Sequence, residues 1–242
     1  MGGVINVIRE QIPRNIPDHI HGSVSFQGET VNKGYSGNVA LIFPFKPFSF
    51  RFDAGGRRGE DISTPAGNLR NTYIDNFNTS AGMSIVLPFG YAGIAGNLYN
   101  TNYGIPGGFV GAHPNGVRIE LNRKFIEAKG EVFLQTDLLK RLEVNTSYSN
   151  YYHRELESNG SLGTEFSLLT FNSSLLFHLD IGNGFQNSKA GLWFENRDFS
   201  AGGFVYTPAS IERTGAAYVY TEYPIGKFSL QGSFRFDGRI IE

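Results

Sequence analysis

The chain has 242 residues and a formal net charge of −1 at pH 7, so it lacks the positive charge excess that is typical of nucleic-acid-binding proteins. It has no cysteine, which excludes disulfide frameworks, thiolate zinc sites and cysteine nucleophiles. Its 31 Gly, 21 Phe and 12 Tyr favour aromatic strands joined by glycine-containing turns, and no apolar run approaches the roughly 18 residues of a membrane-spanning helix.

The first 19 residues differ from the rest of the chain. An apolar stub at residues 2–8 is followed by Pro13 and Pro17, and neither proline has the backbone N–H that a central strand needs. We interpret residues 1–19 as the end of a separate element that leads into the first strand.

From residue 20 onward, apolar and polar residues alternate almost to the end of the chain. Phe50 and Phe52, for example, alternate with Arg51 and Asp53. Such alternation places successive side chains on opposite faces of a strand. The pattern predicts about eleven strands, near residues 20–30, 35–45, 47–57, 73–87, 91–101, 117–134, 141–153, 164–180, 186–198, 213–223 and 227–238.

The connections between these predicted strands mostly alternate between short and long. The short ones are Lys46-Pro47, Pro88-Phe89-Gly90, Gln135 to Lys140, Gly182-Asn183-Gly184 and Pro224-Ile225-Gly226. The long, polar ones are Arg57 to Thr72, Asn102 to Gly116, Arg154 to Gly163 and Phe199 to Glu212. Outer-membrane barrels have short turns on the periplasmic side and longer loops outside, so this pattern indicates a membrane barrel.

A soluble β-sandwich also has alternating strands. It fits less well, because the polar face carries mainly small neutral residues and because aromatic residues gather beside the short turns, as at a membrane interface. These aromatic residues are Phe43, Phe45, Phe48, Phe89, Tyr91, Phe133, Phe177, Tyr223 and Phe228. We therefore predict an all-β fold, an antiparallel meander transmembrane β-barrel in the bacterial outer membrane.

Two sets of side chains test this prediction: Phe50, Phe171 and Phe234 are expected to face lipid, and Arg51, Asn172 and Arg235 to face the interior. Because single-chain bacterial barrels have an even number of strands, an odd count predicts a partial barrel. The last predicted strand also stops at residues 238–242, where an extracellular loop is expected to begin.

Two segments resemble TonB-dependent receptors. Residues 2–8, Gly-Gly-Val-Ile-Asn-Val-Ile, resemble the closing strand of the plug domain of these receptors. Residues 102–108, Asn-Tyr-Gly-Ile-Pro-Gly-Gly, followed by His-Pro-Asn-Gly-Val at 113–117 and the strand Arg-Ile-Glu-Leu at 118–121, resemble a loop found in a subgroup of the family. The resemblance implies that residues 1–19 are the end of a plug and its connector, and that residues 20–242 are the N-terminal portion of the barrel.

The resemblance also implies a function and partners. TonB-dependent receptors are barrels of about 22 strands that take up a scarce ligand, such as an iron-siderophore, another metal chelate or a similar small nutrient. The TonB complex supplies the energy by pulling on the plug. We accordingly expect a transporter and not an enzyme, in contact with outer-membrane lipid, with no resident cofactor. Because most of the plug and about half of the strands are missing, we expect the 242-residue chain alone neither to transport nor to bind tightly.

We expect the ligand to bind at the long loops and the adjacent strand ends, above all at loops 57–72 and 102–116. Arginine grips anionic groups, tyrosine stacks on aromatic ligands, and histidine and asparagine offer nitrogen and oxygen atoms to a metal or chelate. The candidate residues are Arg57, Arg58, Tyr103, His113, Asn115, Tyr152 and His153. Solvated loop charges and interfacial tyrosines account for the same residues, and no histidine has a second ligand at a fixed spacing, so a metal site remains undefined.

Two other functions stay open. A passive or structural barrel would use the charged residues of its lumen to set channel selectivity. A barrel-embedded lipid hydrolase would use Ser174 and His178, although plain lumen lining explains both residues.

Overall fold

The computed structural model of the chain describes residues 10–108, 113–204 and 207–242. Among these residues, no helix is long and apolar enough to cross a membrane. The described residues form the strands β1 (His21–Glu29), β2 (Gly34–Phe45), β3 (Phe48–Gly59), β4 (Ile62–Thr64), β5 (Gly67–Leu69), β6 (Ile74–Leu87), β7 (Gly90–Ile105), β8 (Val117–Phe133), β9 (Leu139–Glu157), β10 (Leu162–Leu179), β11 (Gln186–Gly203), β12 (Ser210–Ile225) and β13 (Phe228–Ile241).

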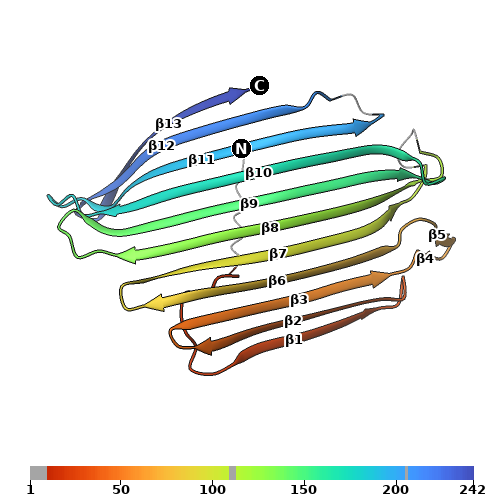
Figure 1. Ribbon diagram of the computed structural model, residues 1–242, viewed down its shortest axis with the longest axis horizontal. Helices are drawn as coiled ribbons and strands as arrows, with labels where there is room; N and C mark the ends of the chain where they lie inside the picture. Colours follow the sequence, from red (N-terminus) through yellow and green to blue (C-terminus); the bar gives the residue numbers. More distant parts are fainter. Residues whose placement is uncertain (1–9, 109–112, 205–206) are drawn as a thin grey trace.

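Eleven of these strands form one antiparallel sheet in the order β1-β2-β3-β6-β7-β8-β9-β10-β11-β12-β13 (Figure 1). Apart from the inserted pair β4–β5, each strand therefore pairs with its neighbours in sequence, which confirms the predicted meander. The sheet is not closed into a barrel, since β1 and β13 each pair on one side only within the described part of the chain. Short turns join the strands at one end of the sheet, and the longer connections lie at the other end (Figure 1).

The strand register confirms the two predicted faces. Directly paired residues of neighbouring strands share a face. One row of such pairs leads from Arg51 through Gly82, Ala95, Glu127 and Ser147 to Asn172, and continues through Glu195 and Thr214 to Arg239, which shares the face of Arg235. Phe50, Phe171 and Phe234 occupy the alternate positions and lie on the opposite face.

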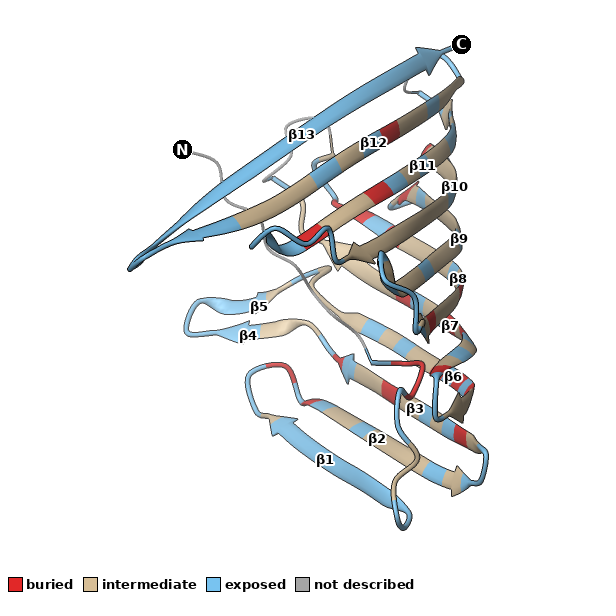
Figure 2. Cartoon of the chain, turned by 90° about the vertical axis from the view of Figure 1, so that its left-hand side faces the viewer, coloured by how far each residue is buried: buried red, intermediate tan, exposed pale blue. Residues whose placement is uncertain are grey.

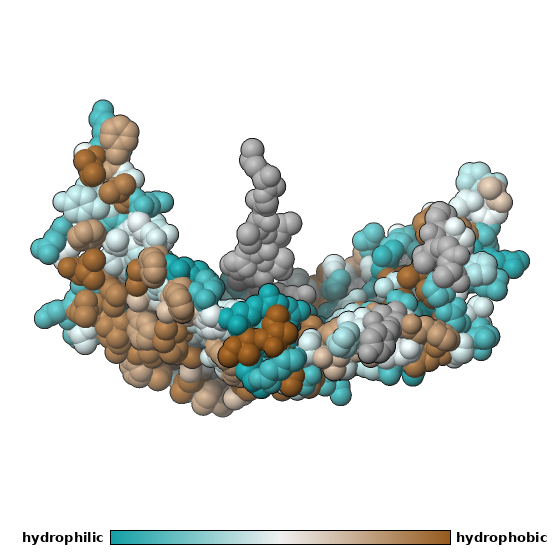
Figure 3. Space-filling model, turned by 90° about the horizontal axis from the view of Figure 1, so that it is seen from above, coloured by the Kyte–Doolittle hydropathy of each residue, from teal (hydrophilic) through white to brown (hydrophobic). Residues whose placement is uncertain are grey.

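The sheet is strongly curved, and its two faces differ in environment (Figures 2 and 3). The face of Arg51 is concave, and residues 10–14 cross it. Gln11 and Ile12 of this segment are buried against the sheet. The residues with plug-like sequence, 2–8, lie outside the described residues.

The convex face is apolar toward the short turns and polar toward the loops. On β8, Val132, Ala128 and Ile126 face outward in the half nearest the short turn, and Lys124 and Asn122 follow toward the loop end. Large apolar side chains stand exposed over the same part of neighbouring strands, and Figure 3 shows them gathered over that half of the convex surface. An exposed apolar band on a curved sheet is typical of a surface that faces lipid.

The predicted boundaries were wrong at the loop ends, where several strands are longer than expected. The segment 102–105 continues β7, 154–157 continues β9, and 199–203 continues β11. The expected loop 57–72 contains the small β4–β5 hairpin. Two aromatic residues were also misplaced. Phe133 pairs with Arg141 and so has the parity of the concave face. Tyr91 faces the concave side as well, where the Arg14 guanidinium lies 5.8 Å from the centre of its ring.

Candidate functional site on the concave face

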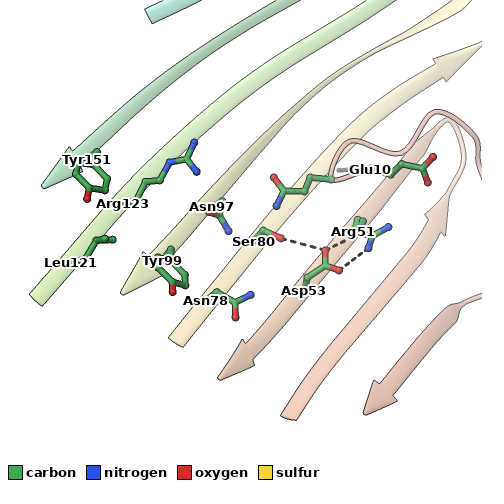
Figure 4. A pocket seen from close by; sticks show the side chains of 11 residues that line it. Glu10, Arg51, Asp53, Asn78, Ser80, Asn97, Tyr99, Leu121, Arg123 and Tyr151 are labelled. Carbon is green, nitrogen blue, oxygen red and sulfur yellow. Dashed lines mark hydrogen bonds and ion pairs between the residues drawn. The ribbon is translucent and has the colours of Figure 1, made fainter. Parts of the chain in front are cut away.

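A cavity of about 760 Å³ lies on the concave face, between the sheet and the segment that crosses it (Figure 4). Five strands, from β3 to β9, and the crossing segment contribute to its lining. The lining residues are Glu10, Gln11, Arg51, Asp53, Asn78, Ser80, Asn97, Tyr99, Leu121, Arg123 and Tyr151.

The strand residues among them lie close together because they are the polar residues of the alternating pattern on adjacent strands, and so point to the same face of the sheet. Asp53 pairs with Ser80, and Ser80 pairs with Asn97, so the three form one row across β3, β6 and β7. A second row runs from Tyr99 through Arg123 to Tyr151. These two rows were not among the residues expected to bind a ligand, although the alternation and the hairpin order together would place their members side by side.

An ion pair lies at the end of the cavity nearest β3. The Arg51 guanidinium donates two hydrogen bonds of 2.8 Å to the Asp53 carboxylate, and the Ser80 hydroxyl donates a third at 3.3 Å. Both charged side chains are about three-quarters buried. This pairing fixes the geometry of the polar wall and neutralises its charge.

Tyr99 and Tyr151 line the opposite wall together with Arg123, and further aromatic rings lie beside this wall. The Tyr151 hydroxyl and His153 Nδ1 lie 2.7 Å apart, and the ring of Phe166 lies 4.8 Å from that of His153. Arg123 donates from Nε to the Ser149 hydroxyl at 3.2 Å, and its guanidinium lies 5.1 Å from the centre of the Phe125 ring. Such a wall can hold a planar or aromatic ligand by stacking, while arginine attracts an anionic group.

The predicted ligand residues divide between the two faces. Arg57, Tyr103 and His153 lie on the concave face, and Arg57 donates from Nη2 to Glu29 at 2.7 Å. Arg58 and Tyr152 lie on the convex face, because each has the parity of the apolar side chains on its own strand. The structure therefore does not bring these two residues to the cavity.

His113 and Asn115 lie above the sheet at the loop end. Nδ1 of His113 is 2.9 Å from a carboxylate oxygen of Glu157, at the end of β9. Asn115 lines a smaller hollow of about 270 Å³ together with Asn71 and Glu157. These contacts connect the predicted binding loop to β9 at a distance from the larger cavity.

Asn71 closes the base of that loop. Its side-chain amide donates to the carbonyl oxygens of Ile105 at 2.7 Å and of Val117 at 2.9 Å, so it joins the end of β7 to the start of β8. Nearby, Lys33 donates to Glu60 at 2.8 Å, and this hydrogen bond raises the pKa of the Lys33 ammonium. The loop end is thus tied together by polar contacts between neighbouring connections.

The structure does not support a Ser174–His178 dyad. The two residues are four positions apart on one strand, which corresponds to about 13 Å and is too far for a hydrogen bond. Nε2 of His178 instead lies 2.6 Å from Glu143 and 2.9 Å from Arg141. Among the described residues, no group of three or more His, Asp or Glu side chains is arranged to hold a metal ion.

No protein family and no curated protein matches the chain at the sequence level. Among solved structures, it is similar to the copper transporter OprC, with a TM-score of 0.75 and 11% identity over 95% of this chain. It is also similar to the FrpB iron transporter from Neisseria meningitidis (F3-3 variant), with a TM-score of 0.73 and 11% identity over 92% of this chain. The chain spans 38% and 41% of the lengths of these two proteins. The chain thus shares the fold of part of each of these two proteins.

Proposed function

We propose that the chain forms part of the wall of an outer-membrane uptake receptor for a small ligand, such as an iron-siderophore, another metal chelate or a similar nutrient. The observation that carries this proposal is the cavity of about 760 Å³ on the concave face, lined by side chains from five strands. The similarity in fold to a copper transporter and an iron transporter supports the same function.

In this proposal, Tyr99, Arg123 and Tyr151 contact the ligand inside the barrel. Tyr103 and His153 extend the same concave surface toward the loops. A chelate brings its own metal ligands, so such a receptor needs only to recognise the outer surface of the chelate. Stacking on tyrosine and a charge-assisted hydrogen bond from arginine serve that purpose. Arg57, His113 and Asn115 would make the first contacts near the outside.

The remaining parts of such a receptor also belong to the proposal. We assign residues 1–19 to the end of a plug and its connector, and residues 20–242 to the N-terminal portion of the barrel, located in the bacterial outer membrane. Two unpaired sheet edges in hydrocarbon are costly, so additional strands would complete the wall. The TonB complex would act through the plug and supply the energy for uptake.

The test is a pair of tyrosine variants on opposite faces of β9. Tyr151→Ala should weaken binding of the transported chelate about tenfold, equivalent to about 1.4 kcal/mol, whereas Tyr148→Ala on the convex face should leave it unchanged. The measurement is saturable uptake and binding of radioactive iron and copper chelates by cells that produce the full-length protein. Equal effects of the two variants would contradict the proposed site.

A passive channel is the second candidate, because ion pairs line the concave face near the short turns. Lys129 pairs with Glu127 at 2.9 Å, and Arg141 pairs with Glu131 at 3.3 Å and with Glu143 at 3.0 Å. Charged pairs of this kind set the selectivity of a pore. A flux that rises linearly with solute concentration, with no saturation and no dependence on TonB, would favour this candidate.

A further inference from the structure

A second concavity, of about 560 Å³, lies on the convex face toward the loop end. Its outward-facing lining comes from β6, β7, β8 and β9, and we call it the convex groove. Its principal residues are Phe77, Asn100, Asn122, Glu120, Tyr152 and Arg154. Because this groove lies on the face opposite the lumen, a ligand passing through the barrel does not reach it.

The height of the convex groove follows from the spacing along β8. A barrel strand crosses the hydrocarbon core in about ten residues. On β8, Val132 is the outward-facing residue next to the short turn. About ten residues away, near Asn122, the strand therefore reaches the opposite edge of the hydrocarbon core. The outward-facing residues between them remain apolar as far as Ile126, which is 52% exposed. The groove thus begins where the acyl chains end and the headgroups of the outer leaflet begin.

The charged groups of the convex groove are already engaged in ion pairs, and among them the Asp75 carboxylate lies 3.9 Å from Nε of Arg58. Arg154 donates to Glu120 at 2.6 and 2.8 Å, and Arg118 lies 2.9 Å from the same carboxylate. Tyr152 donates its hydroxyl hydrogen to Glu165 at 2.7 Å. Arg118 and Arg154 thus both have a carboxylate partner, and this pairing disfavours a phosphate group as the ligand of either side chain.

The neutral groups of the groove point to a different chemistry. Asn122 donates to Asn100 across the β7–β8 pair, and each amide still has further donor and acceptor capacity. Phe77 lies beside them and is 52% exposed, so it offers an aromatic surface within an otherwise polar groove. Such a surface is suited to a sugar. The amides can hydrogen-bond the hydroxyl groups of the sugar, and the aromatic side chain can pack against the C–H face of the sugar ring.

We propose that the convex groove binds the core sugars of lipopolysaccharide, the glycolipid of the outer leaflet. Asn100 and Asn122 hydrogen-bond the sugar hydroxyls, Phe77 packs against a sugar ring, and the acyl chains lie along the apolar band below. This inference rests on the location in the outer membrane and not on transport. Its failure would therefore leave the proposed uptake site, on the opposite face, untouched.

The experiment measures binding of lipopolysaccharide that carries its core sugars to the detergent-solubilised full-length protein. Asn100→Leu/Asn122→Leu should weaken binding about tenfold, as expected for the loss of a few hydrogen bonds. Phe77→Ala should weaken it as well. The matched control is Asn145→Leu/Asn172→Leu on the concave face, which should bind as the unmodified protein does. Free core oligosaccharide should compete for the site, and circular dichroism shows that each variant is folded.

Three results would overturn the proposal. The first is that folded groove variants bind lipopolysaccharide as tightly as the control. The second is that lipid A without core sugars, or phosphatidylglycerol, binds equally well and that the free oligosaccharide does not compete. The third is that native mass spectrometry finds a dimer that the groove variants abolish and no bound glycolipid, which would make the groove an interface between protein copies.

Discussion

Gly82 of β6 lies directly beneath the crossing segment, residues 10–14, and leaves no room for a side chain. A Cβ at this position would lie 2.0 Å from the carbonyl oxygen of Gln11 and 3.2 Å from the Cβ of Ala95. We expect Gly82→Ala to displace residues 10–14 from the concave face, at a cost of about 1–3 kcal/mol, as is typical of overpacking. The measurement is the rate of tryptic cleavage after Arg14, which should rise several-fold.

Gly96 on the neighbouring strand provides the control. It faces the convex side, and a Cβ there would find its nearest neighbour, the carbonyl oxygen of Phe125, at 3.9 Å. Gly96→Ala should therefore leave cleavage after Arg14 unchanged. If both variants are cleaved at the same rate, the segment is not held by its fit against Gly82.

The candidate site could be predicted from the sequence only in part, and the limit lies in long-range pairing. Alternation alone assigns Tyr103 and His153 to the polar face, and it also shows that Tyr152 shares the parity of Tyr148. Tyr152 and Arg58 were nevertheless predicted to bind the ligand, although their parity places both on the apolar face. Which polar residues meet across strands depends on register, and register is set by turns and bulges that a single sequence specifies poorly.

Among the connections, the loop after β7 depends most on one side chain, that of Asn71. Its two hydrogen bonds to Ile105 and Val117 satisfy backbone carbonyls that adjoin the loop, and its φ of 61° is one that asparagine tolerates better than most residues. Asn71→Ala removes both bonds and adds backbone strain. We expect amide hydrogen exchange around Val117 to accelerate by about tenfold, as for a local loss of about 1.4 kcal/mol.

Asn68→Ala is the matched control for this change. Asn68 lies in the exposed β4–β5 hairpin and accepts a hydrogen bond from the Ser63 hydroxyl at 3.1 Å. Exchange around Val117 should not respond to its loss. Acceleration in the control and not in Asn71→Ala would show that another contact closes the loop.

At the level of strands, the sequence predicted the eleven members of the main sheet and their order. The prediction succeeded because each strand alternates over many residues and because proline and glycine mark the turns, as at Gly226, whose φ is 59°. The hairpin β4–β5 was missed, since three-residue strands are too short to show a period. Strand ends were underestimated at the loops, where backbone pairing continues after the apolar alternation stops.

The molecule as a whole consists of one curved sheet with two chemically distinct faces. The concave face holds the cavity and the crossing segment, and the convex face holds an apolar band with the convex groove above it. Alternation in the sequence was sufficient to predict this division, because a period of two fixes which side chains share a face. It could not predict the curvature or the closure of the sheet, which depend on the summed twist of all strands.

We expect the apolar band of the convex face to lie against lipid and the concave face to border an aqueous lumen. Since the chain has no cysteine, a single spin label can be placed at successive positions of β10 in the protein reconstituted into lipid vesicles. The measurement is the collision rate of each label with oxygen, which concentrates in lipid, and with a water-soluble nickel complex. Labels at Leu169, Phe171 and Leu175 should favour oxygen, and those at Thr170 and Asn172 should favour nickel. Collision rates that do not alternate along β10, or a label at Phe171 that favours nickel, would show that the convex face does not lie against lipid.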